Sequence, residues 1–158
     1  MKILVLSDSH HITGYMLRAV EQIRPDVIIH LGDRISDARK LQSLHPEPEY
    51  HMVCGNCDPE AEDDMEQLLT LGGARVFLTH GHRYGVKSGL QMLIDKARRS
   101  EADVALFGHT HIALLRQLPG LWLMNPGQML RHDSEVPASY GVVKIENGEP
   151  ICGIGYIS

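Results

Sequence analysis

The stretch Ile3-Leu4-Val5-Leu6-Ser7-Asp8-Ser9-His10 shows how this chain is organised. Its first four residues form a continuous apolar run, which is typical of a strand buried on both faces of a sheet. The run stops at Ser7, and polar side chains follow at once. We therefore predict a central strand with polar groups collected at its carboxyl end.

A helix and a second strand follow this first strand. Met16, Leu17, Val20 and Ile23 repeat at close to helical spacing, and Pro25 ends that helix. The next apolar run, residues 26–31, predicts a strand that stops at Gly32-Asp33. Strand, helix and strand in this order make a βαβ unit, so the two strands are expected to pair in parallel.

The same alternation continues through the first two thirds of the chain. Further strands are predicted over residues 50–53, 74–79 and 103–107. Further helices are predicted over residues 36–44, from Asp58-Pro59 through the acidic residues 60–66, and along the apolar positions Val86, Leu90, Leu93, Ile94 and Ala97.

The last third of the chain alternates short strands with turns. Strands are expected over residues 113–117, 121–124, 140–145 and 151–157, with Asn147-Gly148 as a hairpin signal. We expect these strands to be antiparallel. Because hairpins need an apolar face to cover, the chain as a whole predicts two mixed sheets packed face to face with helices outside.

Five predicted strands in succession end in a polar cluster. The clusters are Asp8-Ser9-His10, Gly32-Asp33, Gly55-Asn56-Cys57-Asp58, His80-Gly81-His82 and Gly108-His109-Thr110-His111. Because the carboxyl ends of parallel strands share one edge, we expect these clusters to meet in one crevice. Their side chains suit a divalent ion such as Mn, Fe, Zn or Ni. One such cluster is commonly an ordinary turn, but five in succession predict a metal site.

These ordered motifs, D-x-H, G-D, G-N-x-D, H-G-H and G-H-T-H, resemble those of the calcineurin-like metallophosphoesterases, most closely the small single-domain prokaryotic phosphodiesterases. The resemblance covers nearly the whole chain and implies a four-layer αββα sandwich. It also implies two metal ions, one held by Asp8, His10, Asp33 and His111 and the other by Asp33, Asn56, His80 and His109. Asp33 would bridge the two ions, and all seven residues are expected to be catalytic.

The function implied by this resemblance is hydrolysis of a small phosphodiester or phosphomonoester. Two divalent ions, with manganese preferred over Ni, Zn or Fe, would activate a bridging hydroxide for in-line attack. The alternative is a non-catalytic metal-binding interaction scaffold of the same fold, similar to the retromer subunit. A complete ligand set favours the enzyme, because a scaffold has no use for converging ligands.

Position 57 departs from the wider superfamily, in which His often follows the Asn. The thiol of Cys57 is a poorer proton donor than imidazole at neutral pH, because its reference pKa is ~8.5. Cys57 and His82 are candidate substrate contacts, although His82 could equally support His80. Cys54 and Cys57 also form a C-x-x-C motif, but a redox pair would open a helix and a Cys-only zinc site would need a second pair.

Length and composition exclude several classes of protein. The 158 residues, 43% hydrophobic and 22% charged, predict one globular domain over residues 1–158. A net charge of -5 and 5% aromatic residues argue against binding of polymeric nucleic acid. No apolar run approaches the ~18 residues of a membrane span, and no signal peptide is recognisable. Three cysteines are an odd number and make no disulfide framework, so we expect a cytoplasmic protein. The sequence does not decide whether the chain forms a homo-oligomer.

Overall fold

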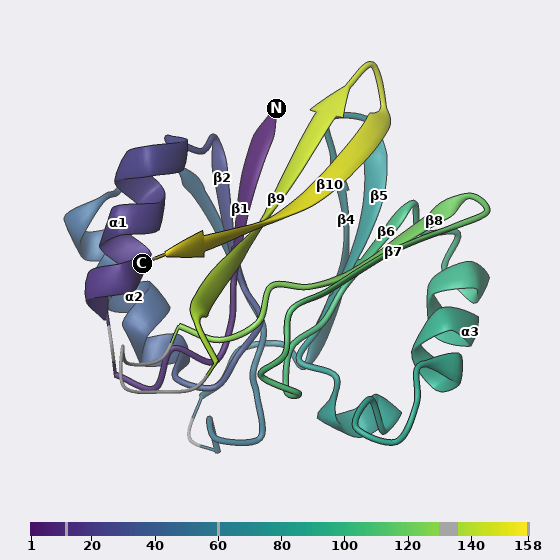
Figure 1. Ribbon diagram of the computed structural model, residues 1–158, viewed down its shortest axis with the longest axis horizontal. Coiled ribbons are helices and arrows are strands. Elements are labelled where there is room, and N and C mark those ends of the chain that lie inside the picture. Colours follow the sequence, from purple (N-terminus) through teal and green to yellow (C-terminus); the bar gives the residue numbers. More distant parts are fainter. Residues whose placement is uncertain (12, 60, 130–135, 158) are drawn as a thin grey trace.

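A computed structural model describes residues 1–11, 13–59, 61–129 and 136–157. These residues form two five-stranded sheets and three helices (Figure 1). The first sheet has the order β10-β9-β1-β2-β3, with bounds β1 Lys2–Leu6, β2 Val27–His30, β3 Glu49–Met52, β9 Ala138–Glu146 and β10 Glu149–Ile157. The second has the order β4-β5-β6-β8-β7, with bounds β4 Glu66–Leu71, β5 Ala74–Thr79, β6 Val104–Leu106, β7 Leu114–Leu118 and β8 Leu121–Asn125. The helices are α1 Thr13–Ile23, α2 Ile35–Leu44 and α3 Gln91–Arg99.

Both sheets combine parallel and antiparallel strands. In the first sheet β1, β2 and β3 are parallel, and the β9/β10 hairpin pairs antiparallel with β1. In the second sheet β5, β6 and β8 are parallel, while β4 and β7 are antiparallel edge strands. The predicted βαβ unit is therefore confirmed, and both sheets are mixed.

Alternate side chains of the central strands are buried on opposite faces of each sheet. Ile3 and Val5 lie in the apolar core between the two sheets, with residues of β5 and β6. Leu4 and Leu6 lie in a second core with residues of α1 and α2, including Met16. A third core joins β5, β6 and α3. The order helix, sheet, sheet, helix is the expected αββα sandwich, and Figure 1 shows α1 and α2 on one side and α3 on the other. In the part of the chain described, no helix is long and apolar enough to cross a membrane.

The helix predicted after Asp58 is wrong. The described residues of this segment, which exclude residue 60, form no helix before β4 begins at Glu66. Acidic composition suggested a helix, but Leu69 and Leu71 alternate toward the core between the sheets, which is the period of a strand. Gly72 and Gly73, both with positive φ, then supply the turn into β5.

Two further expectations need correction. The helix predicted from Val86 begins only at Gln91, because Gly85 and Gly89 adopt positive φ angles and interrupt the helical path. Val86 still packs in the core beside α3. The last third of the chain is also not wholly antiparallel, since β8 pairs in parallel with β6 and so extends the centre of the second sheet.

Candidate metal centre

The five polar clusters come from the carboxyl ends of strands in both sheets. Those after β1, β2 and β3 belong to the first sheet, and those after β5 and β6 belong to the second. The loops that follow these strands gather along the lower edge of the molecule in Figure 1. The candidate ligands are therefore supplied by both sheets, whereas the rule used to predict that they meet concerns a single sheet.

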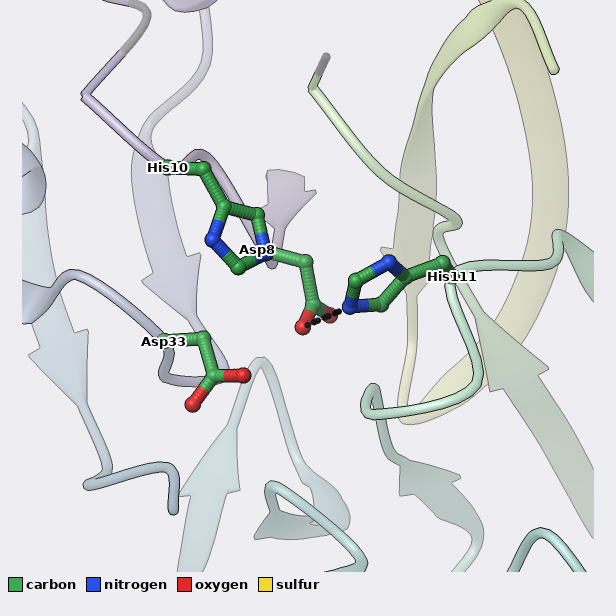
Figure 2. A group of neighbouring side chains, drawn as sticks. All are labelled: Asp8, His10, Asp33 and His111. Atoms are coloured by element: carbon green, nitrogen blue, oxygen red, sulfur yellow. Dashed lines mark ion pairs between the residues drawn. The ribbon is translucent and has the colours of Figure 1, made fainter. Parts of the chain in front are cut away.

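Figure 2 shows the first group of side chains, Asp8, His10, Asp33 and His111. Each offers one nitrogen or oxygen atom, and these atoms all lie within 4.8 Å of one another. His111 Nε2 lies 3.1 Å from Asp8 Oδ1, and the ring centroids of His10 and His111 are 5.1 Å apart. Asp8 is fully buried and Asp33 nearly so.

The second group shares Asp33 with the first and adds His80 and His109, again with ligand atoms within 4.8 Å of one another. His80 Nε2 lies 3.4 Å from Asp33 Oδ2, and its ring is 5.1 Å from that of His109. His80 Nδ1 donates to the carbonyl oxygen of Leu31 at 2.7 Å. Because a carbonyl only accepts, Nδ1 carries a proton, so Nε2 is the nitrogen through which His80 could bind a metal ion.

Three atoms of these groups fit a divalent cation because they are buried and have no hydrogen-bond partner among the described residues. They are Asp8 Oδ1, His10 Nε2 and His80 Nε2. Asp8 Oδ1 is close to His111 but makes no hydrogen bond to it. Leaving buried polar atoms unpaired is costly, and a bound cation would satisfy all three. Carboxylate and imidazole ligands suit Mn, Fe, Zn or Ni.

The carboxylates and imidazoles shift one another's pKa. Burial would raise the pKa of Asp33, but the contact with His80 and the N–H of Cys57 outweigh it and hold that pKa well below its usual range. Burial likewise would lower the pKa of His80, but Asp33 and Asp8 raise it. Asp8 raises the pKa of His111, whereas burial and the nearby His80 lower that of His109. The site attracts positive charge, as a metal centre requires.

Hydrogen bonds from neighbouring residues orient the two carboxylates. Asp8 Oδ2 accepts from Ser7 Oγ at 2.6 Å and from the N–H of His109 at 3.2 Å, which leaves Oδ1 facing the crevice. Asp33 Oδ1 accepts from the N–H of Cys57 at 2.8 Å. A Cβ on Gly55 would lie 2.2 Å from Asp33 Oδ1, and one on Gly108 would lie 2.2 Å from Ser7 Oγ. Only glycine permits these approaches.

Two residues outside the ligand groups, Asp58 and Asn125, support the site through hydrogen bonds. The Asp58 carboxylate accepts the N–H groups of Asp33, Arg34, Ile35 and Gly55 at 2.7–3.0 Å. It therefore joins the loops after β2 and β3, although the G-N-x-D motif suggested only a helix start.

Asn125, at the end of β8, supports the loop that carries two of the histidines. Its amide nitrogen donates to Gly108 O at 3.0 Å and Thr110 Oγ1 at 2.9 Å. Its Oδ1 accepts from the N–H of Gly127 at 2.9 Å. The N-P-G sequence at 125–127 was a usable signal for this role, because Asn side chains commonly bond the backbone two residues on.

The remaining predicted site residues lie beside these groups. Asn56 is exposed in the loop after β3, between Gly55 and Cys57, and its Nδ2 is 3.6 Å from Cys57 Sγ. The ring of His82 is 5.4 Å from that of His80 and 6.0 Å from that of His109. Cys54, Cys57 and Cys152 are free thiols, with Cys54 and Cys152 buried. No observation supports a redox pair.

Known proteins resemble this chain over most of its length. The family model for the calcineurin-like phosphoesterase superfamily domain matches residues 1–148. The probable metallophosphoesterase YsnB of Bacillus subtilis is 35% identical over 150 residues, which cover 93% of this chain and 86% of YsnB. The phosphodiesterase YfcE of Escherichia coli is 33% identical over 99 residues, covering 58% of this chain and 50% of YfcE.

Solved structures show the same fold. A predicted phosphoesterase from Streptococcus pneumoniae superposes with a TM-score of 0.79 at 25% identity, covering 97% of this chain and 87% of that one. A Vps29 variant from Entamoeba histolytica gives a TM-score of 0.78 at 21% identity and covers all of both chains, a likeness of fold alone. The match of the family model, together with the YsnB identity, shows that this chain belongs to the calcineurin-like phosphoesterase superfamily.

Proposed function

We propose that this chain is a dinuclear metal-dependent phosphodiesterase that hydrolyses a small phosphate ester. The observation that carries the proposal is the pair of ligand groups joined by Asp33, each with ligand atoms within 4.8 Å of one another. The buried, unpartnered atoms Asp8 Oδ1, His10 Nε2 and His80 Nε2 support it. The resemblance to YfcE, named a phosphodiesterase, favours a diester over a monoester.

Each group of the chain would have a defined task in this reaction. Asp8, His10, Asp33 and His111 would hold one ion, and Asp33, Asn56, His80 and His109 the other, with manganese preferred. Such ions, when bound, activate water and neutralise charge on the phosphoryl group. Ser7, the N–H of Cys57 and the carbonyl of Leu31 keep Asp8, Asp33 and His80 in fixed orientations, so that little rearrangement is needed during the reaction.

The oxygen of the leaving group needs a proton when the ester bond breaks. Two side chains beside the ligand groups, Cys57 and His82, are candidates to supply it. Partial desolvation and the Asp33 carboxylate raise the pKa of Cys57, so its thiol stays protonated at neutral pH. Burial and the nearby His80 lower the pKa of His82, which leaves that imidazole neutral and better suited to accept than to donate. We therefore assign substrate contact to both Cys57 and His82, and neither side chain is a strong proton donor.

The bridging residue offers the sharpest test. The Asp33→Asn variant keeps the size of the side chain but removes the charge shared by both ions. Chelated and reloaded with Mn²⁺, it should lose most bound metal and at least about 100-fold of its hydrolysis of bis(p-nitrophenyl) phosphate, since even outer partners of metal ligands change activity 10–100-fold. Asp95→Asn, on the far side of the molecule in α3, is the matched control and should behave as wild type.

Metal analysis and rates together decide between the enzyme and its alternative. A full complement of Mn²⁺ and normal hydrolysis in Asp33→Asn would overturn the ligand assignment. Metal binding by the wild-type protein without turnover of any diester or monoester would instead favour an interaction scaffold, a class consistent with the shared fold of Vps29.

A further inference from the structure

A cavity of about 440 Å³ opens beside the bridging carboxylate. Its lining includes Arg34, Ser36 and Arg39 from the start of α2, and Cys57, Pro59 and Ala61 from the loop after β3. We call it the Arg34 pocket. Arg34 directly follows Asp33, and the N–H of Cys57 donates to Asp33 Oδ1 at 2.8 Å. A substrate whose phosphorus lies at the metal centre would therefore extend its second substituent into this pocket.

Arg34 differs from the other charged residues at the Arg34 pocket in its side-chain contacts. Asp58 also lines it, but the carboxylate of Asp58 already accepts four backbone N–H groups. Arg39 forms an ion pair with Asp63. Among the described residues Arg34 has no such pair, and its Nε is buried without a hydrogen-bond partner. The pocket therefore presents one guanidinium that has no ion pair of its own.

The backbone of Arg34 is held by the same contacts that support the metal site. The N–H of Arg34 donates to Asp58 Oδ1 at 2.8 Å, and its backbone is left-handed with φ 79°. A guanidinium binds phosphate or carboxylate through two parallel hydrogen bonds. Among the residues that the structure describes, no aromatic side chain lines the pocket, and its charged side chains are those of Arg34, Arg39 and Asp58.

We propose that the Arg34 pocket is a specificity subsite for an anionic group, preferably a second phosphate, carried by the non-leaving substituent of the phosphodiester. This assignment rests on the proposed function and narrows its substrate class to diesters bearing an additional acidic group. Arg34 is the residue that recognises this group. Arg39 borders the same pocket, but its guanidinium is already in an ion pair with Asp63.

Three p-nitrophenyl diesters of identical reacting centre test the subsite with the Mn²⁺-loaded protein. Their second substituents are propyl, 3-carboxypropyl and 3-phosphonooxypropyl. Wild-type protein should prefer the phosphorylated diester to the propyl one in kcat/KM by about 10–100-fold, the worth of a charge-assisted hydrogen bond. The 3-carboxypropyl diester tests whether the subsite prefers phosphate to carboxylate. If its kcat/KM equals that of the 3-phosphonooxypropyl diester, the subsite binds anionic groups in general.

Variants assign the preference to the pocket. Arg34→Gln should reduce the preference to about onefold, and Arg34→Lys should retain part of it, because a point charge lacks the two-pronged geometry. Arg116→Gln, on the edge strand β7, makes the same change of charge elsewhere and should keep the wild-type preference. An unchanged preference in Arg34→Gln, or none in the wild type, would overturn the proposal.

A binding measurement separates this inference from the proposed function. If the protein hydrolyses none of the three diesters, the phosphodiesterase proposal fails, and the subsite is judged by calorimetry with 1,3-propanediol bisphosphate against propyl phosphate. Tighter binding of the bisphosphate that is lost in Arg34→Gln supports the subsite. Equal affinities in wild type and Arg34→Gln reject it.

Discussion

Left-handed backbone is concentrated at the proposed metal ligands. Among the described residues ten non-glycine residues have positive φ, and five of them are Asp8, His10, Asp33, His109 and His111. Such conformations cost of order 1–3 kcal/mol each and persist only where the surroundings enforce them. At these positions the left-handed conformation turns the backbone shortly after a strand ends. Strained conformations of this kind at the candidate ligands are typical of a binding site.

Cys57 provides a prediction about the leaving group. If its thiol is a weak proton donor, aryl diesters should be hydrolysed much faster than alkyl diesters, whose departing oxygen is more basic. Cys57→His should accelerate the alkyl diesters by about 10²-fold, the lower range for general acids, and Cys57→Ala should change the aryl rates little. Plots of rate against leaving-group pKa for the three proteins provide the measurement. Equally steep plots would show that position 57 does not supply the proton.

His30 makes the stability of the metal-free protein depend on pH. It is fully buried, its Nδ1 accepts from the N–H of Gly32 at 3.2 Å, and its Nε2 lies 3.1 Å from Ser9 Oγ. Burial, opposed by Asp8 and Asp58, lowers its pKa from 6.5 to about 4. Between these values the unfolded chain binds a proton that the folded protein does not, so stability is lost as pH falls below about 6.5.

The expected loss from His30 between pH 7 and pH 4 is about 3 kcal/mol. Guanidinium unfolding of chelated wild type and His30→Gln at both pH values measures it, with Gln chosen because its amide can both accept and donate. The variant should lose about 3 kcal/mol less than wild type over this interval. Equal losses in the two proteins would mean that His30 titrates alike in the folded and unfolded states.

At the scale of elements, the end of α3 carries a removable strain. The N–H of Ala102 donates to Ala97 O and that of Glu101 to Arg98 O, which is the Schellman arrangement with Glu101 at the C′ position. Glu101 has φ 55°, a conformation that glycine adopts more readily. Glu101→Gly should stabilise the protein by up to about 1 kcal/mol, or about 2–4 °C in Tm.

Alanine at the same position is the matched control for this prediction. Glu101→Ala removes the same carboxylate but keeps the left-handed strain, so its Tm should not rise. Thermal unfolding of the three proteins distinguishes the effect of φ from that of charge. A rise of equal size in both variants would assign the gain to the lost carboxylate.

At the scale of the whole molecule, the metal centre exists only when the two sheets are packed together. Asp8, His10 and Asp33 follow strands of the first sheet, and His80, His109 and His111 follow strands of the second. An ion shared by these ligands would bind the folded state in preference to the unfolded chain. Metal binding should therefore stabilise the whole αββα sandwich.

Chelation should accordingly lower the melting temperature. Free Mn²⁺ at 100 times its dissociation constant contributes about 2.7 kcal/mol, which corresponds to roughly 5–10 °C for a chain of this size. Calorimetric scans with and without a chelator measure the shift, and Asp33→Asn should show a much smaller one. An unchanged melting temperature and unchanged activity after exhaustive chelation would rule out the metal site.

The strands were the part of the fold best predicted from the sequence, and the site residues stay a prediction. An apolar run that stops at a polar cluster depends on burial within one strand, so it is visible at Ile3–Leu6 without any tertiary information. The segment before β4 was mispredicted because its acidic residues are typical of a helix start, whereas Leu69 and Leu71 owe their positions to the core between the sheets. Tertiary packing overrode local preference there.

The sequence by itself determined the identity of the candidate ligands and most of the order of helices and strands, because both depend on residue type and local periodicity. It missed β4, and it indicated the two ligand groups only through the family resemblance. The tertiary structure brings the ligand atoms of each group together from strands of both sheets. It also decided the role of Asp58, whose carboxylate binds backbone N–H groups 23–25 residues away in the chain. Likewise Arg34 becomes a candidate anion contact only because packing pairs Arg39 with Asp63 and directs the Asp58 carboxylate to backbone N–H groups. Contacts between distant segments depend on how whole sheets pack, and no local pattern encodes them.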